Sequence, residues 1–240
     1  MAIAFNISDP YIRRARLQPG LLVALPLALA VLAWSPAGLT GWGVLWSVLV
    51  WSGATALLTQ VARDRGKRKE PELFRQWGGK PTTVLLRHRD NPNLVLLDHR
   101  HAKLRELVPS RQLPTAEEEK ADPARTDQVY EACTLRLIEK TRDRKAFPLV
   151  FEENCNYGFR RNLWGMKPVG ILTAALGTGV VATLIIFHVI KGAAVQPVTY
   201  VCGGINLVLL VGWITWFTPA WVRIAADAYA ARLLAACDGL

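Results

Sequence analysis

The sequence predicts an all-α membrane protein with four transmembrane helices in two hairpins and a mainly helical cytoplasmic domain between helices two and three. Three observations predict this fold. Residues 17–62 contain no Asp, Glu, Lys or Arg, and residues 169–222 contain only Lys191. Between these runs, residues 63–167 hold 23 of the 29 Lys and Arg side chains. Soluble domains do not leave runs of this length uncharged.

Each uncharged run is long enough for two membrane crossings. A helix that crosses a hydrocarbon core of ~30 Å needs about 20 apolar residues. We therefore expect four membrane helices, at residues 20–36, 40–62, 169–190 and 198–222. Proline and glycine interrupt the runs at 35–38, 191–192 and 196–197, where we expect the chain to turn. A cleaved signal peptide is the alternative for the first helix, but the second apolar stretch follows directly and would anchor the chain.

The distribution of basic residues predicts the orientation. Lys and Arg beside a span are retained in the cytoplasm. The hairpin turns carry only Lys191, whereas the segments outside the hairpins carry all the other basic residues. We expect a bacterial-type inner membrane with both termini in the cytoplasm. The chain then consists of an N-terminal segment, a hairpin, a basic cytoplasmic domain, a second hairpin and a cytoplasmic tail, at residues 1–18, 19–62, 63–168, 169–222 and 223–240.

The predicted spans carry no ionisable side chain at depth. Transporters coupled to protons or ions usually keep such a residue inside the bilayer, so this class is disfavoured. Asn206 is the one strongly polar side chain well inside a span. We expect it to form an interhelical hydrogen bond, and lining a pore is the alternative.

Helix start signals dominate the predicted cytoplasmic domain. Thr115 and Glu118 match a capping box, in which each side chain accepts a hydrogen bond from the other's backbone N–H. Asp122 followed by Pro123 is a helix N-cap with proline at the first helical position. The alternative to a wholly helical domain is one small β-hairpin that pairs residues 83–86 with 94–97, since short apolar runs do not distinguish strand from helix.

Two candidate ligand sites lie in this domain. The first is a set of cations that would bind an anionic ligand or lipid headgroups: Lys80, Arg87, Arg89, Arg100, Lys103 and Arg105. The second is a set of metal-ligand residue types: His88, Asp98, His99 and His101. Imidazole and carboxylate suit zinc. The neighbouring cations oppose metal binding, so we favour a solvated basic surface over a metal site.

A dense polar stretch precedes the third predicted span. It combines carboxylates, amides, a phenol and guanidiniums: Glu152, Glu153, Asn154, Asn156, Tyr157, Arg160 and Arg161. Adjacent Glu side chains point in different directions on a helix or a strand, which disfavours a catalytic carboxylate pair. We interpret the stretch as a coupling segment that joins the domain to the second hairpin.

The architecture indicates a sensor or effector whose cytoplasmic domain changes the membrane, as an oligomeric pore or a membrane-perturbing signalling protein. The alternatives are a membrane-anchored metal-dependent enzyme and a scaffold for a partner protein encoded nearby. We expect the lipid bilayer and further copies of the chain as partners, and we do not expect nucleic acid, because orientation alone gives membrane proteins a high pI. The residues identify neither a catalytic group nor a cofactor.

Overall fold

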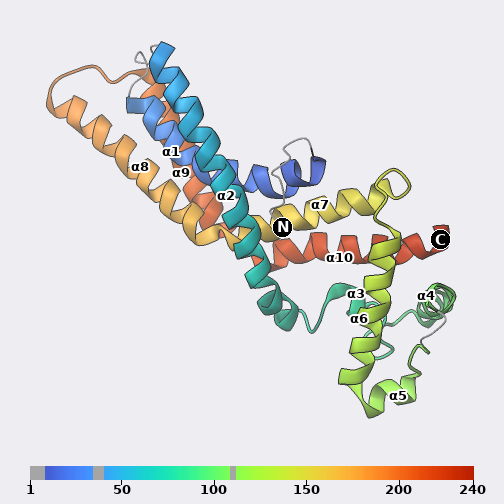
Figure 1. Cartoon of the computed structure of the whole chain (residues 1–240). Coiled ribbons are helices and arrows are strands. Elements are labelled where there is room, and N and C mark those ends of the chain that lie inside the picture. Colours follow the sequence, from blue (N-terminus) through green and yellow to red (C-terminus); the bar gives the residue numbers. More distant parts are fainter. Residues whose placement is uncertain (1–8, 35–40, 109–111) are drawn as a thin grey trace. The chain divides into compact units, whose positions relative to one another are not determined.

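The computed structural model describes residues 9–34, 41–108 and 112–240, and for residues 41–56 it describes the backbone only. The described residues are 82% helical and form no strand (Figure 1). The β-hairpin alternative is therefore wrong. Residues 94–97 form the first turn of helix α4 (Leu94–Leu107), because the Asn93 side chain accepts a hydrogen bond of 3.0 Å from the Leu96 N–H and caps that helix.

The chain folds into two compact units. Unit 1 consists of Met1–Lys69 and Gly158–Trp221, and unit 2 of Glu70–Tyr157 and Val222–Leu240. The chain passes from one unit to the other three times. Each passage falls inside a helix: α2 (Gly41–Gln76), α7 (Pro148–Gly165) and α10 (Pro219–Ala235).

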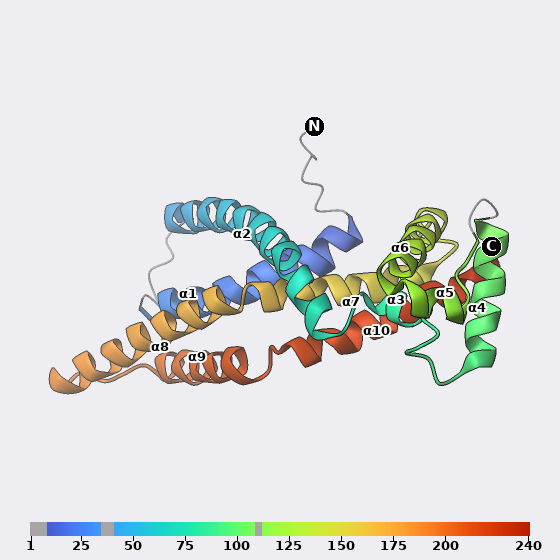
Figure 2. The ribbon, with the colours of Figure 1, turned by 90° about the horizontal axis from the view of Figure 1, so that it is seen from below.

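Among its described residues, unit 1 contains three helices that are long and apolar enough to cross a membrane. The first is a continuous helix, Ile12–Trp34, made of a π-helical turn (η1, Ile12–Leu17) and α1 (Gln18–Trp34). The others are α8 (Lys167–Ile190) and α9 (Pro197–Thr215), which lie beside α1 (Figure 2). Val208 and Ile190 are 71% and 77% exposed, as expected for side chains that face lipid.

The observed ends of these helices differ from the predicted ends. The first begins at Ile12 instead of residue 20, and α9 ends at Thr215 instead of residue 222, because Pro219 starts the separate helix α10. The turn between α8 and α9 lies where predicted, with Gly192 at φ +63° and Pro197 at the start of α9. The predicted turn at 35–38 lies outside the described residues. Residues 41–62 of the predicted span at 40–62 fall within α2, and most of their side chains lie outside the described residues.

Close helix packing forms the core of unit 1. The buried side chains of Val23, Leu163, Met166 and Trp213 meet there. Trp213 is 1% exposed because its ring lies directly on Gly170 of α8, where any Cβ atom would overlap it. In a membrane such close approach is a main source of helix association.

Unit 2 contains the remaining short helices around one apolar core. They are α3 (Pro81–Val84), α4, α5 (Ala116–Ala121), α6 (Pro123–Lys140) and the 3₁₀ turn η2 (Ala236–Gly239). The predicted capping box is confirmed, with Thr115 N–H donating to Glu118 at 2.8 Å and Glu118 N–H to Thr115 at 3.2 Å. Leu233, Leu234 and Cys237 join the core, so the segment predicted as a separate tail belongs to unit 2.

Candidate functional site

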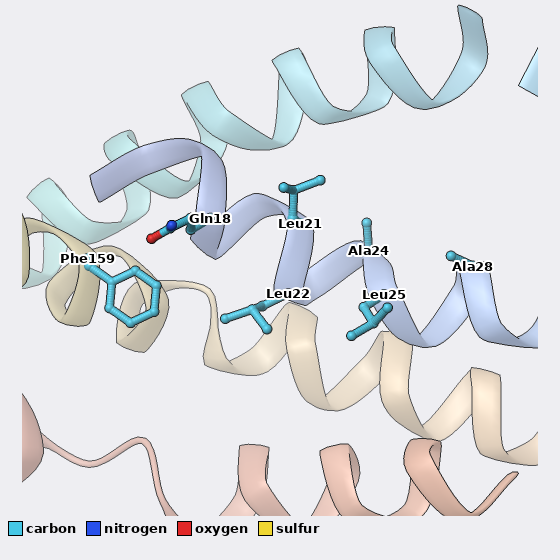
Figure 3. A pocket seen from close by; sticks show the side chains of 7 residues that line it. All are labelled: Gln18, Leu21, Leu22, Ala24, Leu25, Ala28 and Phe159. Carbon is cyan, nitrogen blue, oxygen red and sulfur yellow. The ribbon is translucent and has the colours of Figure 1, made fainter. Parts of the chain in front are cut away.

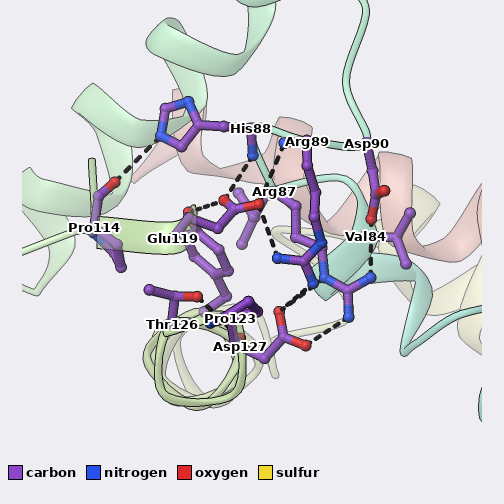
Figure 4. Close-up of polar contacts among 12 residues, drawn as sticks. Val84, Arg87, His88, Arg89, Asp90, Pro114, Glu119, Pro123, Thr126 and Asp127 are labelled. Carbon is purple, nitrogen blue, oxygen red and sulfur yellow. Dashed lines mark hydrogen bonds and ion pairs between the residues drawn. The ribbon is translucent and has the colours of Figure 1, made fainter. Parts of the chain in front are cut away.

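Arg87 is the centre of a buried ion-pair network in unit 2 (Figure 4). It lies just after α3, and its side chain is 8% exposed. Its Nε and Nη2 donate to the two carboxylate oxygens of Asp127 at 2.8 and 2.6 Å, and Nη1 donates to Asp90 at 2.9 Å and to the Gly78 carbonyl at 2.8 Å. Such a two-pronged pair is both strong and geometrically specific. These hydrogen bonds raise the pKa of Arg87, so it stays charged.

A double-glycine turn makes room for this guanidinium. Gly78 and Gly79 have φ of +80° and +147°, a region that favours glycine. A Cβ atom on Gly79 would lie 2.7 Å from Nη2 of Arg87. The two glycine N–H groups donate to the carbonyls of Arg75 and Phe74. The turn therefore surrounds a cation with its backbone instead of presenting N–H groups to an anion.

Glu119 of α5 is the second buried ion of the network, with a side chain that is 2% exposed. It accepts hydrogen bonds from the His88 N–H at 2.8 Å, the Arg89 guanidinium at 2.9 Å and the Tyr130 hydroxyl at 3.0 Å. Burial acts to raise the pKa of Glu119, but these hydrogen bonds outweigh it and the pKa is lowered. Burial, together with the Glu119 carboxylate, raises the pKa of Tyr130. We call Arg87, Arg89, Glu119, Asp127 and Tyr130 the polar hub.

The predicted metal residues divide between the interior and the surface. His88 and His101 point inward, with ring centroids 5.0 Å apart, and their Nε2 atoms lie 3.2 and 2.8 Å from the carbonyls of Pro114 and Leu86. Burial lowers the pKa of His101, which favours the neutral ring. Asp98 and His99 are exposed, and His99 pairs with Asp238 at 2.7 Å. No three His, Cys, Asp or Glu side chains converge as metal ligands in the described part of the chain.

The six predicted anion-binding cations have different surroundings. Arg87 and Arg89 belong to the polar hub, Lys80 pairs with Glu131 at 2.6 Å, and Lys103 pairs with Glu106 at 3.1 Å. The remaining two differ in surroundings: Arg100 donates to the Leu85 carbonyl at 3.3 Å, and Arg105 is exposed. The residues of unit 2 include 17 Lys and Arg and 17 Asp and Glu, so this unit is neutral overall.

The predicted coupling segment lies within helix α7 and contributes to both units. In unit 2, the Tyr157 hydroxyl donates to Glu70 of α2 at 3.1 Å, and its ring stacks on Tyr229 of α10 at 6.2 Å between centroids. Glu70, Tyr157 and Tyr229, here called the helix tie, thus join the three helices in which the chain leaves unit 2. Other members of the segment are more exposed: Glu152, Glu153, Asn154 and Asn156.

In unit 1 the segment ends in a polar contact that sequence reasoning missed. Asn162 is fully buried, donates to the Ala15 carbonyl at 2.7 Å and accepts from its neighbour Arg161 at 3.1 Å. A Cβ atom on Gly66 of α2 would overlap the Asn162 side chain, and one on Gly165 would lie 2.6 Å from the Gly66 nitrogen. We call Ala15, Gly66, Asn162 and Gly165 the basal junction. The recurrence of glycine beside a buried amide is the signal that could have identified it.

Arg160 closes the same part of unit 1. Its Nη1 donates to the Trp221 carbonyl at 2.9 Å, and its guanidinium lies 4.8 Å from the centre of the Trp221 ring. This cation–π contact and hydrogen bond hold the start of α10 against α7. Arg160 and Arg161 therefore both make contacts within unit 1.

Asn206 lies fully buried where α1, α8 and α9 meet. A Cβ atom on Gly177 of α8 would lie 3.1 Å from the Asn206 amide nitrogen and 2.7 Å from the Pro26 carbonyl of α1. Neither polar atom of the Asn206 side chain has a hydrogen-bond partner among the described residues. The expected interhelical hydrogen bond is therefore not formed with any described side chain, and the Asn206 side chain is enclosed instead of lining an open channel.

Comparison of the chain with protein-family models, curated proteins and solved structures found no match.

Proposed function

We propose that the protein is a multi-pass inner-membrane sensor or effector, with four membrane helices in two hairpins and unit 2 in the cytoplasm. The composition of unit 2 is evidence for the second hairpin. It is one packed body built from residues before α8 and after α9, so it lies on one side of the bilayer. The chain between residues 158 and 221 then crosses an even number of times, and α8 and α9 supply two crossings.

The contacts of the basal junction are evidence for the first hairpin. Ala15 lies near the start of the first apolar run, and Gly66 lies just after its end. Both pack against Asn162, so the chain leaves this run on the side where it entered. Two crossings satisfy this condition, the first by α1 and the second by the part of α2 at 41–62.

The charge distribution supports the cytoplasmic location of unit 2. Unit 1 contains 12 Lys and Arg but only two carboxylates, Asp9 and Asp64. Eleven of these cations lie in three stretches beside the basal junction, at residues 13–16, 63–69 and 160–167, and the twelfth is Lys191 in the α8–α9 turn. Basic residues beside spans are retained inside.

The helix tie is the observation that supports regulation by unit 2. Tyr157 contacts Glu70 and Tyr229, so one side chain connects all three helices that continue into unit 1. A ligand or partner that opens the polar hub would repack the core of unit 2, and the displacement would reach the membrane helices through these three connected helices. Signals of this kind act by changing the balance between two packings of one element.

We propose that the affected activity is ion permeability through an assembly of several copies. One copy has only four membrane helices, which pack against each other in the manner of a bundle and enclose no wide channel. The outward faces of α8 and α9 offer large apolar side chains for contacts between copies, including Phe187, Val201 and Val208.

The test is the K⁺ permeability of lipid vesicles that hold the purified full chain at matched density. We expect Asp127→Asn, which removes the hub's central carboxylate charge, to increase K⁺ flux severalfold over wild type. Adding Tyr157→Phe to this variant should abolish the increase, because the hydrogen bond that links α7 to α2 in the helix tie is lost. Glu139→Gln, in an exposed ion pair on the same helix α6, is the matched control. Equal flux in all these vesicles would refute the proposal.

A further inference from the structure

An apolar groove runs along helix α1 beside Phe159 of α7 (Figure 3). Its volume is about 460 Å³, and Gln18 is its only polar lining side chain among the described residues. The lining residues are Gln18, Leu21, Leu22, Ala24, Leu25, Ala28 and Phe159. From Gln18 to Ala28 the helix rises about 15 Å. This length equals one leaflet of a hydrocarbon core of ~30 Å.

The groove opens next to an excess of positive charge. Gln18 begins α1, and its N–H donates to the Arg13 carbonyl across the π-helical turn η1. Arg13 therefore lies one turn before the mouth of the groove, with Arg14 beside it, and both are exposed. Arg63 and Arg161 lie close enough to Arg16, which belongs to the same turn, for their charges to act on it. The basal junction brings these segments together.

The carboxylates of unit 1 do not balance this charge. There are only two against 12 Lys and Arg, and Asp9 accepts a hydrogen bond of 2.8 Å from the Tyr11 N–H at the start of the first helix. Unit 2 is neutral by itself. The net positive charge beside the groove therefore attracts anions from outside the chain, and at the end of a membrane helix the nearest ones are lipid phosphates.

We propose that this groove and its cationic mouth bind one anionic phospholipid of the cytoplasmic leaflet. One acyl chain lies along α1 from Gln18 to Ala28. Arg13 and Arg14 hold the phosphate, since guanidinium binds phosphate through two parallel hydrogen bonds. The Gln18 amide lies between the headgroup and the apolar wall. The assignment to the cytoplasmic leaflet rests on the orientation proposed above, whereas the match between groove and lipid does not.

The test measures lipid binding to the purified full chain in detergent by native mass spectrometry, with phosphatidylglycerol and phosphatidylcholine as probes. We expect one phosphatidylglycerol per chain, bound about tenfold or more tightly than phosphatidylcholine. The headgroup without acyl chains, glycerophosphoglycerol, should bind more than tenfold more weakly than the lipid, because it leaves the groove empty.

Two pairs of variants separate the headgroup from the acyl chain. Arg13→Gln with Arg14→Gln should remove the preference for phosphatidylglycerol, whereas Arg142→Gln with Arg144→Gln, exposed in unit 2, should leave it unchanged. Ala28→Phe, which fills the deep end of the groove, should weaken both lipids about tenfold. Val31→Phe, on the same helix at a 59% exposed position outside the lining, should not.

Equal binding of the two lipids by the wild type overturns the proposal. Lipid binding that is altered neither by Arg13→Gln with Arg14→Gln nor by Ala28→Phe overturns it as well. Strong binding of glycerophosphoglycerol overturns the acyl-chain assignment and leaves a free anion as the ligand. Labelling of a cysteine introduced by Arg13→Cys with a membrane-impermeant reagent in intact cells distinguishes the two proposals. Labelling from outside refutes the orientation and the cytoplasmic leaflet, whereas lost lipid selectivity with an inward-facing residue refutes the lipid site alone.

Discussion

The hydroxyl of Tyr157 donates a 3.1 Å hydrogen bond to the Glu70 carboxylate, 87 positions earlier in the chain. Tyr157 is 8% exposed, and its ring stacks in parallel on Tyr229, with 4° between the planes. Glu70, Tyr157 and Tyr229 lie on α2, α7 and α10, and each of these helices contains residues of both units. A single buried side chain therefore sets the spacing of α2, α7 and α10 within unit 2.

Tyr157→Phe keeps the ring stack and removes the hydrogen bond. We expect it to reduce the free energy of unfolding of unit 2 by about 1 kcal/mol. Tyr200→Phe, at a 52% exposed position of α9, should change stability by less than about 0.5 kcal/mol. The stabilities of both variants are measured by unfolding the detergent-solubilised chain in urea and detecting the unfolding of unit 2 by limited proteolysis. Equal stability of the two variants would show that the Tyr157–Glu70 contact carries no energy.

Asp127→Ala should be the most damaging single change in the polar hub. It removes both prongs of the Arg87 pair and leaves a guanidinium that is 8% exposed without its main partner. Breaking such a buried pair costs about 3 kcal/mol or more. Glu139→Ala breaks a pair whose side chains are 49% and 54% exposed, and should cost less than about 1 kcal/mol. The midpoints of urea unfolding compare the two, and similar midpoints would contradict the burial of the hub.

The double-glycine turn predicts opposite responses at adjacent positions. Gly79→Ala should reduce the free energy of unfolding by about 2 kcal/mol, because φ is +147° and the new methyl meets the Arg87 guanidinium. Gly78→Asn should cost less than about 1 kcal/mol, since φ is +80°, asparagine tolerates this region, and a Cβ atom meets nothing within 4 Å. Thermal unfolding of both variants beside wild type measures the difference, and the reverse order would refute this account of the turn.

Local patterns predicted the helices of this chain well. The runs at 17–62 and 169–222, which are almost free of charged residues, predicted the apolar helices. A charge in lipid is costly at every position of a span, so charged residues are rare along its whole length. The Thr115–Glu118 capping box and the Asp122 cap were also predicted, since the interacting groups lie three residues apart. The end of α9 was missed by seven residues because hydropathy continues through Thr218 and Pro219 into the start of α10.

Contacts between distant segments were not predictable from the sequence. Arg87 was assigned to a ligand surface, but its partner Asp127 lies 40 positions away, and no spacing rule joins them. His88 and His101 approach across two segments, whereas the adjacent His99 points outward to Asp238. The segment from 222 joins unit 2 through Leu233 and Leu234, whose apolar spacing indicates a helix without naming the surface on which it packs.

The stability of unit 2 should decrease as the pH falls below about 6.5. The folded-state pKa of His101 is lowered by burial, so between this pKa and the unfolded value of 6.5 the unfolded chain binds more protons. Acid therefore favours unfolding. The lowered pKa of Glu119 acts in the same direction below about 4.5. Urea unfolding at pH 7.5, 6.5 and 5.5 measures the slope.

His101→Phe should flatten this dependence between pH 7.5 and 5.5. It also leaves the Leu86 carbonyl without its 2.8 Å partner, so stability at pH 7.5 should fall by about 1 to 3 kcal/mol. His99→Gln, at an exposed position, should retain the slope. A slope that survives in His101→Phe would assign the pH dependence to another group.

The position of unit 2 on the cytoplasmic side, with α8 and α9 as a hairpin, is the central claim. The most direct measurement uses pairs of reporter fusions in intact cells, one pair after Leu240 and one inserted after Gly192 in the α8–α9 turn. Green fluorescent protein should fluoresce at the C-terminus, and alkaline phosphatase should be active only in the turn. Phosphatase activity at Leu240, or fluorescence from both positions, would contradict the orientation and with it the proposed control of the membrane by unit 2.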